Sequence, residues 1–182
     1  MIFSPRSDVL NSATIGRRAV PVGCALALTA APLAAACPDL TVLRCQVEGG
    51  KQLEICADAE AVRYSFGPIS NPELELSNPL AASGYRPWPG VSRTIWDSVT
   101  FENDAYVYEV VTSLERIYPE EEEADITVLR RDGVYVLKNE MPVAELICLP
   151  DTVEGAVDLL YDHLGSHGMC WSFSTHAWEV CE

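Results

Sequence analysis

Hydrophobic and polar residues alternate along most of the chain between Leu40 and Leu149, and this period of two predicts β-strands. Gly49-Gly50 separates the first two alternating segments and supplies the positive φ of a tight hairpin, while Gly67-Pro68 ends the third. About eight such segments with short connections predict a mainly β fold, an antiparallel meander arranged as a sandwich or a small barrel. The expected strands span residues 40–48, 51–58, 61–66, 94–103, 104–115, 124–131, 134–139 and 142–149.

Some positions within the sheets follow from the same pattern. The short alternating segment 73–77 lies among several prolines, so we expect it at a sheet edge, where missing N–H donors do little harm. Segment 104–115 is apolar on both faces, which is typical of a central strand. Asp132-Gly133 is the strongest short hairpin signal in the chain, so we expect strands 124–131 and 134–139 to be joined by a turn there.

Helical spacing occurs only after Pro150. Apolar residues recur at intervals of three and four from Val153 to Leu164, with Thr152 as a candidate N-cap and Gly165 as the expected end of the helix. The aromatic tail that follows contains two cysteines. We expect it to be a strand or loop held against the domain.

The N-terminal part of the chain has the organisation of a secretory signal. Residues 1–18 are polar and end in Arg17-Arg18, residues 19–36 are uncharged and rich in Ala, Leu and Val, and Ala34 and Ala36 form an A-x-A cleavage pattern. We therefore expect residues 1–36 to be a signal peptide, and residues 37–182 to be a single disulfide-stabilised β-rich domain in the periplasm or outside the cell. The alternative is an uncleaved anchor.

A lipid anchor at Cys37 is a further possibility to weigh. The lipoprotein pattern places Leu or a similar residue three positions before the cysteine, whereas Leu33 is four positions before Cys37. The spacing therefore disfavours acylation. No later segment is apolar enough over about 20 residues to predict a membrane span.

Removal of the leader leaves an even number of cysteines, which in an oxidising compartment indicates a disulfide framework. Six cysteines allow 15 pairings. We favour one long-range bond from Cys45 or Cys56 to Cys148 and a local bond from Cys170 to Cys181. Zinc binding by these thiols is disfavoured because the sequence has no C-x-x-C pair. The six residues are Cys37, Cys45, Cys56, Cys148, Cys170 and Cys181.

Charge narrows the classes of partner. The leader contains three arginines and Asp8, so residues 37–182 hold 9 basic and 26 acidic residues and carry a formal charge of −17. Such a surface repels phosphate backbones, which argues against nucleic acid and anionic membranes and favours a basic protein. The acidic run Glu120 to Glu123 is interpreted as a solvated loop because it lacks the spaced ligands of a calcium site.

A proline-stiffened loop contains the best candidate binding residues. Tyr85, Arg86 and Trp88 lie in the sequence YRPWPG, and Trp96 follows shortly after. Tyr, Trp and Arg dominate binding hot spots, and a stiff loop presents them with little entropy left to lose. The alternative is that Tyr85 and Trp88 close one end of the β core.

The three histidines are further candidates for a metal or hydrolytic site. His163 and His167 have helical i, i+4 spacing, but we expect Gly165 to end the helix between them, and His176 lies further along the tail. The sequence has no nucleophile elbow, glycine-rich phosphate loop or dinucleotide fingerprint. We therefore expect no enzyme, no catalytic residues and no cofactor.

Several segments together resemble a group of uncharacterised exported proteins of Gram-negative bacteria. They are the signal peptide, the Cys45-x10-Cys56 hairpin, VRYSFG, PELELS, YRPWPG, IWDSVTFENDAYVYEV, RRDG and a late Cys-Trp. More distantly, the acidic disulfide-bonded β domain is similar in outline to periplasmic inhibitors of lysozyme. Those proteins carry a Ser-Gly-x-x-Tyr signature, whereas Ser83-Gly84 is followed at once by Tyr85.

These observations favour an exported acidic protein-binding module, of the kind that inhibits a basic partner such as lysozyme. One alternative is an envelope or structural protein without a specific ligand. Another is a hydrolase or metal-binding protein that uses His163, His167 and His176. Oligomeric state is not encoded in any pattern found in the sequence.

Overall fold

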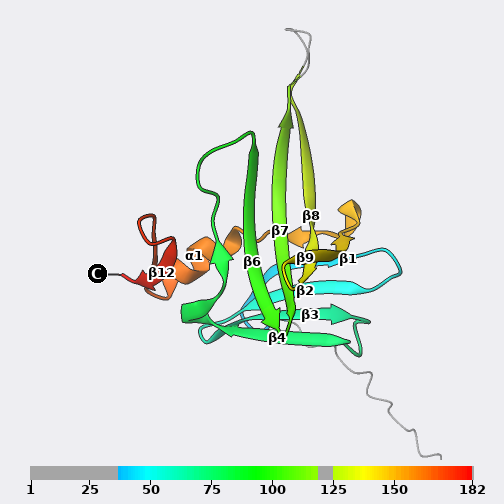
Figure 1. Cartoon of the computed structure of the whole chain (residues 1–182), viewed down its shortest axis with the longest axis horizontal. Helices are drawn as coiled ribbons and strands as arrows, with labels where there is room; N and C mark the ends of the chain where they lie inside the picture. The colour runs from blue at the N-terminus through cyan, green and yellow to red at the C-terminus, as the bar shows by residue number, and fades with distance from the viewer. Residues whose placement is uncertain (1–36, 119–124, 182) are drawn as a thin grey trace, which may run out of the picture. The chain divides into compact units, whose positions relative to one another are not determined.

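A computed structural model describes residues 37–118 and 125–181 (Figure 1). The expected signal peptide and the acidic run Glu120 to Glu123 lie outside the described residues. The described residues form twelve antiparallel β-strands, one α-helix and two short 3-10 helices. The predicted mainly β class is confirmed. The strand number exceeds the expected eight largely because strands of two to four residues leave little periodicity in the sequence.

The first sheet has the strand order β10-β1-β2-β3-β4. Its alternation follows the sequence: Leu53 and Ile55 of β2 are fully buried, while Glu54 between them points to the other face. The edge position predicted for segment 73–77 is confirmed by β4. The strands are β1 Leu40–Gln46, β2 Gln52–Ala57, β3 Ala61–Gly67, β4 Leu74–Pro79 and β10 Glu154–Gly155.

The second sheet has the strand order β5-β6-β7-β8-β9, so the central position predicted for segment 104–115 is confirmed by β7. Strands β6 and β7 are joined at Asp104, whose φ of 53° is a left-handed conformation that Asp tolerates in turns. The strands are β5 Tyr85–Arg86, β6 Thr94–Asn103, β7 Tyr106–Ile117, β8 Thr127–Lys138 and β9 Met141–Ile147.

The two sheets pack face to face around one hydrophobic core, and their strands cross at a steep angle (Figure 1). Tyr64 of β3 joins the layers, since its ring centroid lies 5.5 Å from that of Phe101 on β6 and 5.6 Å from that of Tyr108 on β7. The arrangement is therefore a β-sandwich, one of the two predicted architectures.

The hairpin predicted at Asp132-Gly133 is wrong, because β8 runs unbroken through both residues. Asp132 is only 4 % exposed and accepts hydrogen bonds of 2.7 and 3.0 Å from the guanidinium of Arg130. A Cβ at Gly133 would lie 2.5 Å from the carbonyl oxygen of Leu146 on β9. The glycine thus permits close approach of two strands. The chain turns after β8 at Asn139-Glu140, within the turn that the sequence predicts between residues 139 and 142.

The helix is shorter than predicted, because α1 spans only Leu159–Ser166. Thr152 belongs to a 3-10 helix, Pro150–Thr152; its Oγ1 donates to the carbonyl of Leu149 and accepts from the backbone N–H of Gln46 at 2.9 Å. The next residues form β10, where a Cβ at Gly155 would meet the carbonyl oxygen of Val42 at 2.2 Å. Pairing with β1 therefore replaces the first two helical turns.

Three disulfides lie within the described residues: Cys37–Cys56, Cys45–Cys148 and Cys170–Cys181. The long-range and the local predictions are both confirmed, with Cys45 as the partner of Cys148. The local bond closes the hairpin of β11 (Met169–Ser172) and β12 (Ala177–Val180). The sulfur of Cys37, the residue weighed above as a lipid-anchor site, is bonded to Cys56 in this structure.

Candidate functional site

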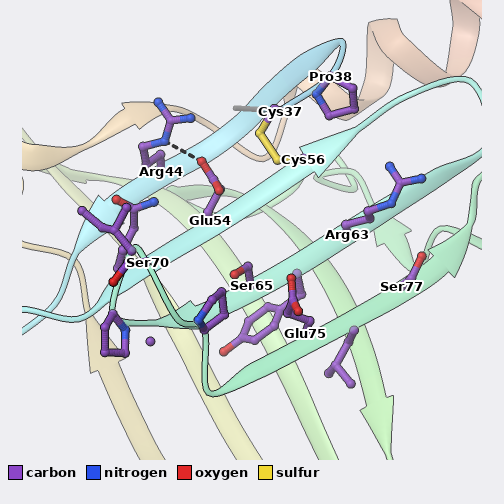
Figure 2. Close-up of a pocket in the computed structure, with 17 residues that line it drawn as sticks. Cys37, Pro38, Arg44, Glu54, Cys56, Arg63, Ser65, Ser70, Glu75 and Ser77 are labelled. Atoms are coloured by element: carbon purple, nitrogen blue, oxygen red, sulfur yellow. Dashed lines mark hydrogen bonds and ion pairs between the residues drawn. A yellow bond between two sulfur atoms is a disulfide. The ribbon is translucent and has the colours of Figure 1, made fainter. Parts of the chain in front are cut away.

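A groove of about 890 Å³ runs across the solvent-facing side of the first sheet (Figure 2). Its floor consists of outward residues from β1 to β4, and the loop after β3 closes one side. A cavity of this size is within the range of ligand-binding sites. The residues used below are Arg44, Glu54, Arg63, Ser65, Glu75 and Ser77.

Strand alternation places these polar side chains on one face. In β3 the buried Tyr64 points into the core, so its neighbours Arg63 and Ser65 point outward into the groove. Across the next strand pair Ser65 lies opposite Glu75, and Arg63 lies opposite Ser77. The same alternation that builds the core thus builds the groove.

The walls of the groove are stiff. Pro38 and the Cys37–Cys56 disulfide border one side (Figure 2). Pro68 and Pro72, in the loop after β3, also line the groove. A disulfide and prolines reduce the conformational freedom that a binding site would lose when a ligand binds. The groove is therefore largely preorganised.

Two guanidinium groups in the groove are already paired. Arg44 donates from Nε to Glu54 Oε1 at 2.6 Å and from Nη1 to Glu154 Oε2 at 3.0 Å. The hydrogen bond to Glu54 raises the pKa of Arg44, and burial partly opposes this effect. Arg63 donates to the carboxylate of Asp58 and, together with backbone donors, lowers the pKa of that carboxyl to about 2.

Glu75 is the exception among these charged groups. Its side chain is exposed in the groove and forms no ion pair with any of the described residues. The groove therefore offers one free carboxylate beside the hydroxyls of Ser65 and Ser77, between apolar walls. This combination suits a ligand with a cationic group and further hydrogen-bonding groups.

The lining of the groove provides side chains that can form hydrogen bonds. Among the described lining residues there is no histidine, and both cysteines are joined in a disulfide. A serine hydroxyl is a weak nucleophile unless an adjacent base activates it. The hydroxyls of Ser65 and Ser77 can each donate and accept a hydrogen bond in the groove.

The structure places Tyr85, predicted from sequence as a binding residue, in the core. Its side chain is only 2 % exposed, its ring stacks on Trp178 with centroids 5.7 Å apart, and its hydroxyl donates to Asp97 Oδ1 at 2.6 Å. Burial, and then the hydrogen bond to Asp97, raises the pKa of Tyr85 well above its usual range. Tyr85 thus fulfils the alternative interpretation, in which it closes the β core.

Arg86 and Trp96 lie together on the outer face of the second sheet. The Arg86 guanidinium carbon is 5.6 Å from the centroid of the Trp96 ring, a cation–π distance. Trp88 is half-buried, and its indole Nε1 donates to the carbonyl of Val91 at 2.8 Å. These residues form a surface separate from the groove, which is on the first sheet.

Sequence reasoning missed the groove altogether. The available signal was the set of polar residues at alternate positions of segments 51–58 and 61–66, since such residues share one face of a sheet. The sequence could not show that the loop after β3 and the Cys37–Cys56 disulfide rise on both sides of that face.

The histidines divide into a pair and a single residue. The rings of His163 and His167 lie 4.5 Å apart at the end of α1, whereas His176 lies in the turn of the β11–β12 hairpin. The helix ends at Ser166, one residue after the expected end at Gly165, and His167 is its C-cap.

Comparisons with known proteins identify no relative: no family model, curated protein or solved structure matches the chain. The resemblance to exported proteins and to lysozyme inhibitors therefore stays a prediction.

Proposed function

We propose that the chain is an exported, non-catalytic binding module whose groove accepts an extended segment of a basic partner protein. The observation that supports this proposal is the groove of about 890 Å³ with the unpaired carboxylate of Glu75 between stiff walls. A lysine or arginine of the partner would pair with Glu75, and the serine hydroxyls would bind its main chain.

The net charge supports the choice of a basic partner. Residues 37–182 carry a formal charge of −17, and opposite charge raises the rate of association in a salt-dependent manner. Charge alone does not give specificity, because any cationic protein would be attracted. Specificity would come from the groove.

Export rests on the leader and on the disulfides. Disulfides persist in oxidising compartments, and a bond between Cys37 and Cys56 is compatible with cleavage after Ala36, the predicted site. Among residues 37–118 and 125–181, no helix is long and apolar enough to cross a membrane. We therefore propose the periplasm or the extracellular space as the site of action.

Inhibition of a lysozyme is the specific form of this function that the sequence resemblance implies. It requires that the protein slow the hydrolysis of cell walls by a purified lysozyme. The alternative, an envelope protein without a specific ligand, accounts for the fold and the charge. It does not account for a preorganised groove.

The end of the β7–β8 hairpin is a competing contact surface. Large apolar side chains gather there with 44–57 % of their surface exposed, and exposed apolar patches commonly mark protein contacts. The residues are Ile117, Tyr118, Ile126, Val128 and Leu129. A test of the proposal must therefore distinguish this hairpin from the groove.

The experiment is a selection of random peptides on the immobilised protein, expressed as the full chain with its own leader. We expect enriched peptides to contain lysine or arginine, and to bind more weakly at about 0.15 M salt than at low salt. Glu75→Lys should weaken them about tenfold, whereas Glu102→Lys, which changes the net charge equally on the exposed face of β6, should have a much smaller effect.

A second pair of variants tests the groove by filling it. Ser65→Trp places a large side chain on the groove floor, and Val107→Trp places the same side chain on the solvent face of β7. Only the first should abolish binding. The proposal is wrong if the peptides bind Ser65→Trp as well as the unmodified protein, or if Leu129→Lys is the substitution that removes binding.

A further inference from the structure

The end of α1 and the first residues after the predicted cleavage site bring three possible metal ligands together. Asp39, His163 and His167 each offer one ligand atom, and these atoms lie within 4.8 Å of one another. Asp39 and His167 are exposed, while His163 is 9 % exposed. The cluster is independent of the groove and does not rest on the proposed function.

Helix geometry explains the histidine pair. Residues four apart lie on the same face of a helix, one turn above the other. Because α1 continues through Gly165 to Ser166 and His167 is its C-cap, the i, i+4 relation is maintained to the end of the helix.

The hydrogen bonds of the two rings select the tautomers that bind metal. Nε2 of His163 lies 3.1 Å from the carbonyl oxygen of Asp58, and Nδ1 of His167 lies 2.8 Å from the carbonyl oxygen of His163. A carbonyl oxygen only accepts, so both of these nitrogens carry the proton. In the neutral rings the lone pairs are therefore on Nδ1 of His163 and Nε2 of His167.

Such an arrangement is characteristic of metal sites. Histidines that bind a metal donate their other N–H to a carboxylate or a backbone carbonyl, which fixes the tautomer and the orientation of the ring. Both histidines have this second interaction in the described structure, and each has it with the backbone.

We propose that Asp39, His163 and His167 form a binding site for one Zn²⁺ ion. Two imidazole nitrogens and one carboxylate oxygen are typical zinc donors, and three protein ligands leave the fourth tetrahedral position to water. Calcium and magnesium prefer sites made of oxygen ligands alone. Ligand atoms around tetrahedral zinc lie about 3.4 Å apart, so the exposed side chains of Asp39 and His167 move inward when the ion binds.

The ion would attach the beginning of the domain to its helix. Asp39 lies two residues after Cys37, whose disulfide already joins this segment to β2. Zinc would add a second link, from the same segment to α1. Because a ligand that binds only the folded state stabilises it, zinc should raise the melting temperature.

Isothermal titration with Zn²⁺ tests the site, on protein expressed as the full chain with its own leader and without a polyhistidine tag. We expect one ion per chain, and about 10- to 100-fold weaker binding for His167→Ala and for Asp39→Ala, since even the loss of an outer hydrogen bond has an effect of this size. These two residues are exposed, so their variants should fold. His176→Ala is the matched control and should bind as the unmodified protein does.

Co²⁺ provides a second measurement, because its visible absorption reports four-coordinate geometry. The band should form with the unmodified protein and with His176→Ala, and be lost in His167→Ala. The proposal is overturned if the unmodified protein binds no stoichiometric zinc at micromolar concentration, or if His176→Ala weakens binding as much as His167→Ala does. Unchanged affinity in both His167→Ala and Asp39→Ala also overturns it.

Discussion

The hydroxyl of Tyr85 donates a 2.6 Å hydrogen bond to the carboxylate of Asp97, which anchors the start of the proline-rich loop to β6. Burial raises the pKa of Asp97, and the hydrogen bond from Tyr85 partly opposes this effect. The loop is thus fixed by a half-buried carboxylate beneath it, and Tyr85 has a structural role.

Tyr85→Phe removes this donor and leaves the ring in place. Hydrogen bonds to charged groups contribute about 1.5–3 kcal/mol, so we expect a loss of that size in the free energy of unfolding, measured in urea. Tyr118→Phe removes a hydroxyl from a residue that is 52 % exposed and should change stability by less than about 0.5 kcal/mol. Equal effects of the two substitutions would show that the hydrogen bond from Tyr85 to Asp97 does not stabilise the folded protein.

Two glycines should respond to alanine in opposite directions. In Gly133→Ala the new Cβ meets the carbonyl oxygen of Leu146 at 2.5 Å, so we expect a destabilisation of about 1–3 kcal/mol. Gly165 lies within α1 with none of the described atoms near its Cβ position, so Gly165→Ala should stabilise the protein by about 0.5–1 kcal/mol. Thermal unfolding of both variants measures the difference. A stable Gly133→Ala would contradict the pairing of β8 with β9.

The disulfides should differ in their contributions to stability. Cys45–Cys148 spans 103 residues and Cys170–Cys181 spans 11. In the chain-entropy model these bonds contribute about 4.7 and about 2.8 kcal/mol. We therefore expect the double Cys→Ala replacement of the first pair to lower the free energy of unfolding more. A larger loss on removal of Cys170–Cys181 would show that the chain-entropy model does not describe the disulfides of this fold.

The lowered pKa of Asp58 predicts how the stability of the folded state depends on pH. Its pKa is lowered from the usual 3.8 to about 2, mainly by the hydrogen bond from Arg63. A lowered carboxyl pKa stabilises the folded state above pH 3.8, and this stabilisation is lost as the pH falls towards 2. Arg63→Ala should shift the midpoint of Asp58, followed by carboxyl NMR, upward towards 3.8, while Arg93→Ala should leave it unchanged. A midpoint that stays at about 2 in Arg63→Ala would assign the effect to the backbone donors alone.

Much of the fold follows from local patterns, because a period of two is imposed by every half-buried strand. Other local features predicted the edge position of β4, from its prolines, and the central position of β7, from apolar residues on both faces. The partner of Cys170 was predicted from the nearness of Cys181 in the sequence. The errors at Asp132-Gly133 and before α1 have a different origin. Gly133 was interpreted as part of a turn, and the apolar spacing from Val153 to Leu164 was interpreted as helical without regard to Gly155. At both glycines the missing side chain lets another strand approach.

The candidate site was less accessible to sequence reasoning. Tyr85, Arg86 and Trp88 are consecutive or nearly so, but a strand sends alternate side chains to opposite faces, so Tyr85 enters the core while Arg86 remains on the surface. The groove depends on the Cys37–Cys56 bond, one of the pairings that spacing could not select. The histidine pair was found, but its partner Asp39 is distant in sequence.

The proposed groove is tested most directly by mapping a bound ligand. The tightest basic peptide from the selection is titrated into isotope-labelled protein, and amide chemical shifts are followed by NMR. The account predicts that the largest changes lie on β2, β3 and β4, around Glu54, Ser65 and Glu75, and that they disappear in Ser65→Trp. Changes centred on Leu129 in the β7–β8 hairpin, or on Arg86 and Trp96, would contradict it.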